Sequence, residues 1–188
     1  MPRLLLLLSL VSLAVAFAAR WWFGLRILAT EGEQLCKCDL ATWFPGKSGE
    51  AVVHRADGTA DSFGRQLRMK AMEEWADEQP KAAASRENSR RFGQAVPPLS
   101  IIIAVFALIV AKVPFLGAVA IIVAATSLAA VLGVLTLTPE LQAIHRAAKK
   151  ARAVKAFPDR DQETIIIRCA LAHAWKEAFP PILKLIQK

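Results

Sequence analysis

The chain has 188 residues, a hydrophobic fraction of 55% and a formal net charge of +8. This length fits one domain plus membrane helices and excludes two sizeable soluble domains. The apolar residues are clustered, because the ranges 4–19, 96–111 and 113–137 contain no charged residue while the intervening segments are densely charged. Such blocks are typical of membrane-spanning helices, whereas a soluble core spreads its apolar residues periodically.

Residues 1–29 predict an N-terminal membrane anchor. As a helix, the charge-free stretch 4–19 spans only about 24 Å, less than the hydrocarbon core of ~30 Å. We therefore expect the helix to continue through Trp21–Ile27, with Arg20 reaching the headgroups and Trp21 and Trp22 in an interfacial belt. The alternative is a secretory signal peptide cleaved near Ala16-Phe17-Ala18. We favour the uncleaved anchor.

Residues 30–95 predict a small, polar and mostly helical region. Apolar residues recur every four positions from about residue 59, at Phe63, Leu67, Ala71 and Trp75. This spacing indicates an amphipathic helix, which Pro80 should end. A second charged helical segment is expected over Lys81–Arg91, and Ala51–His54 is a candidate short strand.

Residues 96–137 predict a transmembrane helical hairpin made of the apolar runs Val96–Ala111 and Val113–Leu137. Pro97 and Pro98 are expected in the first turn of the first helix, where a missing N–H is tolerated. The only break between the runs is Lys112-Val113-Pro114, so the two helices should be antiparallel neighbours. Small residues along the second helix would let the backbones approach closely.

Residues 138–188 form a basic tail. It contains an amphipathic C-terminal helix from near Asp161, with Ile167, Leu171 and Trp175 on its apolar face and His173 on its polar face. Such a helix lies in the membrane interface or packs on its own domain, and both alternatives stay open. The fold class is therefore an all-α membrane protein with an anchor helix, a hairpin, this amphipathic helix and the small polar region.

The distribution of Lys and Arg predicts the sidedness. Residues 20–95 contain 12 of them and residues 138–188 contain 10, while Arg3 and Lys112 are the remaining two. The positive-inside tendency places both charged regions in the cytoplasm of a multi-pass protein, and we expect the inner membrane of a bacterium. A cleaved signal peptide would instead place residues 19–95 outside.

The basic residues flank the apolar runs, which favours membrane lipid as the partner rather than nucleic acid. Aromatic residues interleaved with these cations, as base stacking would need, are lacking. A protein partner or a homo-oligomer is the other expected interaction. The candidate contacts to lipid headgroups are Arg20, Arg90, Arg91, Arg146, Lys149, Lys150 and Arg152.

No catalytic, cofactor-binding or metal-binding residue is assigned from the sequence. His54, His145 and His173 are far apart, and the spacing of Cys36 and Cys38 falls outside the usual zinc patterns. The carboxylates Glu73, Glu74, Asp77 and Glu78 fit a solvated helix face paired with nearby cations. Residues 113–137 contain no charge and offer no proton relay, so a transporter or channel is not expected.

One stretch carries a family resemblance. Val131–Ala147, which ends in Leu-Thr-Pro-Glu-Leu-Gln-Ala-Ile-His-Arg-Ala, resembles the end of the YugP-type membrane neutral zinc metallopeptidases, and Thr164–Ile186 is similar to their closing helix. The resemblance covers at most residues 96–188. Those enzymes are expected to carry His-Glu-x-x-His-x-x-Gln, but Met72 and Ala76 stand where zinc ligands should be. The resemblance implies a degenerate scaffold, and no catalytic residue is carried over.

The leading hypothesis is a non-catalytic integral membrane protein, a scaffold whose cytoplasmic portion docks a partner or contacts anionic lipid. The flanking cations, the amphipathic tail helix and the missing catalytic motif support it. The alternative is an enzyme, a divergent membrane zinc metallopeptidase that uses unrecognised ligands.

Overall fold

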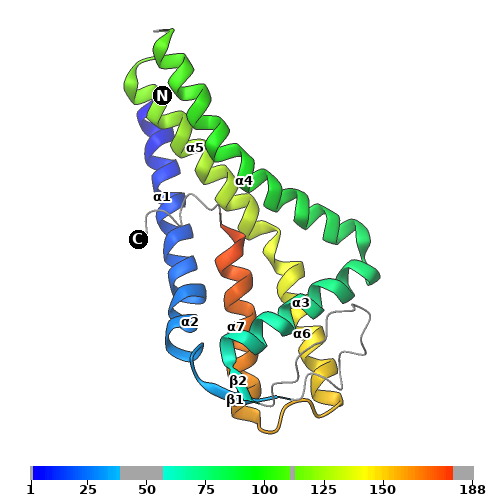
Figure 1. Cartoon of the computed structure of the whole chain (residues 1–188). Coiled ribbons are helices and arrows are strands. Elements are labelled where there is room, and N and C mark those ends of the chain that lie inside the picture. The colour runs from blue at the N-terminus through cyan, green and yellow to red at the C-terminus, as the bar shows by residue number, and fades with distance from the viewer. Residues whose placement is uncertain (1, 39–56, 111–112, 180–188) are drawn as a thin grey trace. The chain divides into compact units, whose positions relative to one another are not determined.

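The computed structural model describes residues 2–38, 57–110 and 113–179 of the chain (Figure 1). The predicted all-α membrane class is confirmed, because the sheet consists of two three-residue strands and three helices are long and apolar enough to cross a membrane. The elements in chain order are α1 (Pro2–Arg20), the π-helix η1 (Trp21–Leu25), α2 (Arg26–Glu31), β1 (Leu35–Lys37), β2 (Asp57–Thr59), α3 (Ala60–Glu78), α4 (Pro80–Ile109), α5 (Phe115–Leu135), α6 (Leu137–Ala153) and α7 (Arg160–Ala178).

The chain divides into two compact units. The membrane unit comprises Met1–Trp21, Ala84–Thr138 and Glu177–Lys188, and the polar unit comprises Trp22–Ala83 and Pro139–Lys176. Each unit is therefore assembled from segments that are far apart in the sequence. The candidate strand Ala51–His54 lies outside the described residues.

In the membrane unit, α1 packs against α5. The buried positions of α5 are small residues, which let the helix backbones approach closely, and they comprise Ala118, Ala120, Thr126, Ser127, Ala129, Ala130 and Gly133. Large apolar side chains point outward instead, among them Ile102, Phe106 and Ile109 of α4. An exposed apolar surface of this kind is stable in lipid and not in water. Both features fit membrane-spanning helices.

The helix α4 differs from the expectation that a membrane helix opens at Val96. It runs without a break from Pro80 to Ile109, so Pro97 and Pro98 lie inside the helix and Pro80 occupies its first turn. Proline is costly at an internal position, because it removes a backbone hydrogen bond. Here Pro97 is fully buried and its carbonyl accepts a hydrogen bond of 2.7 Å from Ser100 Oγ. Tertiary packing thus overrides the local preference of proline.

In the polar unit, the predicted stripe of α3 is confirmed, since Phe63, Leu67, Ala71 and Trp75 are all buried. Thr59 caps the helix by accepting a hydrogen bond from the Ser62 backbone N–H at 3.3 Å. The antiparallel pair β1–β2, with Cys36 opposite Gly58, leads into α3.

The helix α6, which the sequence did not predict, has the clearest division into two faces. Its small and apolar side chains point into the unit at the helical period of three to four residues, whereas its cations are exposed. The buried positions within the polar unit are Glu140, Ala143, Ile144, Ala147, Ala148 and Ala151.

The helix α7 packs within the chain, which is one of the two alternatives left open by the sequence. Ile166, Cys169 and Ala170 are completely buried, and a Cβ on Gly64 of α3 would lie 2.7 Å from Cys169 Cβ. His173 is also buried, although the pattern placed it on the polar face. The contact of Gly64 with α7 therefore depends on the absence of a side chain at that position.

Candidate functional site

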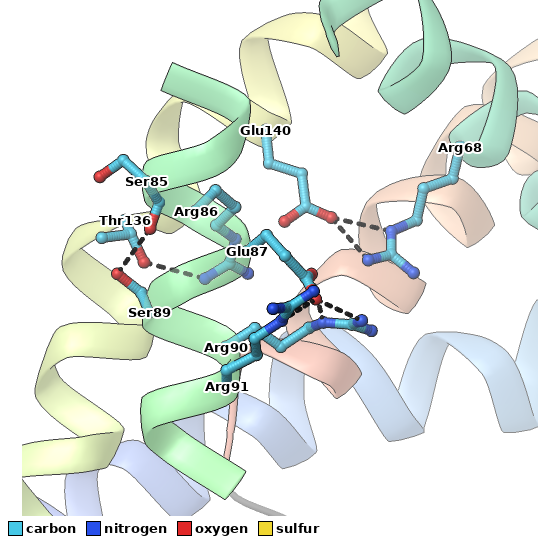
Figure 2. A network of polar contacts seen from close by, with 9 residues as sticks. All are labelled: Arg68, Ser85, Arg86, Glu87, Ser89, Arg90, Arg91, Thr136 and Glu140. Carbon is cyan, nitrogen blue, oxygen red and sulfur yellow. Dashed lines mark hydrogen bonds and ion pairs between the residues drawn. The ribbon is translucent and has the colours of Figure 1, made fainter. Parts of the chain in front are cut away.

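Arg90 and Arg91 of α4 form an exposed cationic site in the membrane unit. Their side chains converge on the same carboxylate (Figure 2), with Arg90 Nε 2.9 Å from Glu87 Oε2 and Arg91 Nε 3.0 Å from Glu87 Oε1. The side chains of Arg90 and Arg91 are 45% and 72% exposed. Two guanidinium groups therefore share one carboxylate, which leaves the three side chains with a net positive charge.

Arg20, another candidate for lipid contact, is differently placed. It ends α1 and is only 2% exposed, so its guanidinium lies against protein. A cation within a membrane span normally faces protein rather than lipid. Its position predicts a structural role in the membrane unit.

The candidate cations of α6 are exposed, and three of them are paired with acidic residues of the polar unit. Lys150 Nζ lies 2.9 Å from Glu74 Oε2 and 3.1 Å from Glu78 Oε1. The other two pairs join Arg146 to Glu78 at 3.7 Å and Arg152 to Glu163. The carboxylate cluster of α3 thus serves as counter-charge for α6. Exposed pairs of this kind stabilise a fold by about 0–1 kcal/mol each.

Lys149 is the remaining α6 candidate, and its side chain is exposed.

The excess of basic over acidic residues differs between the membrane unit and the polar unit. The membrane unit contains eight basic and two acidic residues, and the polar unit contains 16 basic and 14 acidic residues. The net charge of the chain therefore belongs mainly to the membrane unit.

Arg86 is a buried arginine whose role was not apparent from the sequence. It is 5% exposed, and its Nη1 donates to Gly133 O at 3.0 Å and to Thr136 Oγ1 at 2.9 Å (Figure 2). These acceptors lie at the C-terminal end of α5, where carbonyl groups lack helical donors and the helix dipole favours a cation. Arg86 thus joins the start of α4 to the end of α5.

The polar unit contains a buried ion pair between α3 and α6. Arg68 Nε and Nη2 lie 2.8 Å and 2.7 Å from Glu140 Oε1, and the two side chains are 14% and 1% exposed. Burial makes such a pair costly to break, because either partner alone would be an uncompensated charge.

Beside α7 lies a group of buried titratable residues. Burial raises the pKa of the Cys169 thiol to about 12, with the charges of Glu31 and Asp61 adding to the effect. Burial also lowers the pKa of His173, whose Nε2 lies 2.8 Å from Asp61 Oδ1. A thiol with so high a pKa is a poor nucleophile. In the described part of the chain, no three His, Cys, Asp or Glu residues are grouped closely enough to hold a metal ion.

Comparison with known families identifies a membrane protein family. The model of the MMPL family, a family of membrane transporters, matches residues 68–178, which is more than half of the chain. The chain belongs to the MMPL family. The comparison finds no match among curated proteins and none among solved structures.

Membership of the MMPL family corrects the resemblance to YugP-type zinc metallopeptidases. The matched region includes Val131–Ala147 and most of Thr164–Ile186, the two stretches on which that resemblance rested. Those stretches consist largely of Ala, Leu, Ile and Val, which recur in membrane and buried helices of unrelated families because the same apolar environment selects them. A degenerate metallopeptidase and a divergent metallopeptidase are therefore both set aside.

The MMPL match and the three apolar helices identify a multi-pass integral membrane protein that contacts lipid. The matched region takes in α4, α5, α6 and α7 in full. Family membership does not assign an activity, because related folds carry different functions on different sites.

Proposed function

We propose that this MMPL-family chain is a non-catalytic membrane protein that binds anionic lipid headgroups through Arg90 and Arg91 and presents its polar unit to a protein partner in the cytoplasm. The observation that carries the proposal is the exposed pair of arginines that shares the single carboxylate of Glu87.

The position of this pair along α4 supports lipid contact. A hydrocarbon core of ~30 Å takes up about 20 helical residues. Twenty residues counted back from Val110 end at Arg91, so both arginines come at the boundary between the core and the headgroups. Cations immediately beyond a span attract anionic lipid, each contributing about 1 kcal/mol near the surface.

The charge balance of the polar unit supports a protein partner. Its cations Arg146, Lys150 and Arg152 are engaged by carboxylates of the same unit. A surface with alternating charges recognises a protein of complementary charge better than it recognises a uniformly anionic membrane. Lys149 stays in the proposed lipid-contact set, because its side chain is exposed.

The lipid contact is tested by the double variant Arg90→Gln/Arg91→Gln. Anionic lipid retained by the purified protein is counted by native mass spectrometry, with the double variant Arg65→Gln/Arg160→Gln as the matched control. We expect the test variant to retain several-fold less anionic lipid, since about 1 kcal/mol per arginine is at stake. Equal retention by the wild type and the test variant would contradict the proposal, as would an equal loss in the control.

A second candidate function is transport, which the family match favours. The charge-free runs 4–19, 96–111 and 113–137 contain no ionisable side chain that could couple transport to protons. If this chain takes part in proton-coupled transport, the ionisable residue that binds the proton would therefore have to come from another subunit of an assembly. Uptake of a solute driven by a pH gradient into vesicles that contain the purified chain alone would favour transport over the docking role.

A further inference from the structure

We infer that Trp22 and Arg26 form a binding element for the headgroup of an anionic phospholipid at the membrane interface. The inference rests on the proposed membrane placement and adds a second lipid site, on the N-terminal helix. Arg26 Cζ lies 4.3 Å from the centroid of the Trp22 ring, and both side chains are exposed. A cation–π contact of this kind holds the guanidinium plane over the indole.

The neighbouring residues fix which way this pair faces. Phe23 stacks on Trp175 of α7, with ring centroids 5.2 Å apart and an interplanar angle of 28°. Gly24 is buried, and a Cβ there would lie 3.4 Å from Ala172 O and from the Lys176 backbone nitrogen. Because Phe23 and Gly24 are held against α7, Trp22 and Arg26 are left on an outward face of the helix.

The π-helix η1 provides this arrangement. A π-helical turn contains an extra residue relative to an α-helix, shifts the faces of the helix that follows and is frequent at functional sites. Here the turn covers Trp21–Leu25, in the middle of a helix that runs on from α1 into α2. It brings Gly24 to α7 while Trp22 stays 57% exposed.

The depth of the pair matches the interface. About 20 helical residues cross a hydrocarbon core of ~30 Å, and 20 residues counted from Leu4 end at Phe23. Trp22 therefore comes at the edge of the core, where tryptophan is enriched. Arg26 lies about 6 Å further along the helix, within a headgroup layer about 5–7 Å thick.

The chemistry of the pair selects a phosphate group. A guanidinium stacked on an indole still has its N–H groups free in its own plane, where they can bind two phosphate oxygens. Among the described residues no carboxylate pairs with Arg26, and the nearby Glu31 carboxylate lies 2.9 Å from Arg168 Nη1 instead. The positive charge of Arg26 favours lipids with a net negative charge.

The depth of Trp22 in the membrane is tested by tryptophan fluorescence of the full chain in lipid vesicles. The vesicles contain phosphatidylglycerol and a phosphatidylcholine whose acyl chains carry bromine near the headgroup. We expect bromine to quench part of the emission in the wild type and the quenched part to be clearly smaller in Trp22→Phe, where only the neighbouring exposed Trp21 still contributes to it. The control Trp175→Phe should keep the quenched part, because Trp175 stacks on Phe23 and is less exposed than Trp22. Quenching that is the same in Trp22→Phe as in the wild type overturns the inference.

Headgroup selection is tested by the retention of phosphatidylglycerol during purification. Arg26→Gln should retain about fivefold less, the equivalent of ~1 kcal/mol, while Arg26→Lys recovers part of the retention and the charge-matched control Arg65→Gln stays at the wild-type level. Unchanged retention in Arg26→Gln overturns this inference. If Arg26→Gln retains lipid normally but Arg90→Gln/Arg91→Gln loses lipid in the same assay, the proposed function stands and only the Trp22–Arg26 site is rejected.

Discussion

At the scale of single residues, Glu140 shows how burial changes the role of a side chain. It lies in the first turn of α6, where an exposed acidic side chain would interact favourably with the helix dipole. In the structure it is 1% exposed and meets Arg68 of α3 at 2.7 Å. The pair therefore links two helices that are about 70 positions apart in the sequence.

We predict that Arg68→Ala destabilises the polar unit by about 3–5 kcal/mol, because it leaves the Glu140 carboxylate buried without its counter-charge. The matched control is Arg65→Ala, whose pair with Asp61 is exposed at 60% and 34% and should contribute about 1 kcal/mol or less. Thermal unfolding of both variants in detergent measures the difference.

A double variant separates the charge from the packing. Arg68→Met/Glu140→Leu removes both charges and keeps much of the side-chain volume, so it should be more stable than Arg68→Ala. Equal melting temperatures for Arg68→Ala and Arg65→Ala would show that the pair is not buried in the folded protein.

At the scale of elements, the helices α4 and α5 show which local signals can be overridden. Pro97 and Pro98 are the strongest sequence signal for a helix start, yet α4 begins at Pro80 and continues through them. The end of α5 is contacted by a side chain distant in the sequence, since Arg86 donates to Gly133 O and Thr136 Oγ1. Local propensity amounts to only a few kcal/mol, which packing and buried hydrogen bonds can exceed.

Two glycines of the membrane unit give an element-scale prediction. A Cβ on Gly133 of α5 would lie 2.0 Å from Ala178 O, whereas a Cβ on Gly93 of α4 would have nothing within 4 Å. We expect Gly133→Ala to destabilise the unit by about 1–3 kcal/mol through overpacking. Gly93→Ala should be neutral or stabilising by up to about 1 kcal/mol, because alanine is the better helix former. In the same detergent, the melting temperature of Gly133→Ala should therefore fall below that of the wild type, while that of Gly93→Ala should stay equal or rise.

At the scale of the whole molecule, the membrane topology is constrained by the two chain segments that make up the polar unit. Its two parts, Trp22–Ala83 and Pro139–Lys176, are separated in the chain by both helices of the hairpin. They can form one compact unit only if the chain returns to the side that it left. An even number of crossings between them satisfies this requirement.

Reporter fusions test the topology and its direction. Fusions after Gln79 and after Phe179 should report the cytoplasm, and a fusion after Val113 should report the opposite side, because the cations concentrate in the segments flanking the hairpin. A cleaved signal peptide would reverse all three readings. Different readings at Gln79 and Phe179 would contradict the returning hairpin itself.

The sequence by itself determined the membrane class and the apolar stripe of α3. These follow from hydrophobic blocks and from a four-residue period, and both are local in the chain because the solvent around each segment selects them. The candidate cations Arg90 and Arg91 were also visible in the sequence, as charges beside an apolar run.

The tertiary structure decided which polar side chains are buried and what they contact. The burial of Arg20, the Arg68–Glu140 pair, the Arg86 contacts with α5 and the orientation of Trp22 and Arg26 all depend on helices from distant parts of the chain. A sequence pattern indicates whether a segment faces lipid, water or protein, but it does not indicate which distant segment packs against it. Long-range pairing of buried polar groups is therefore the information that only the folded chain supplies.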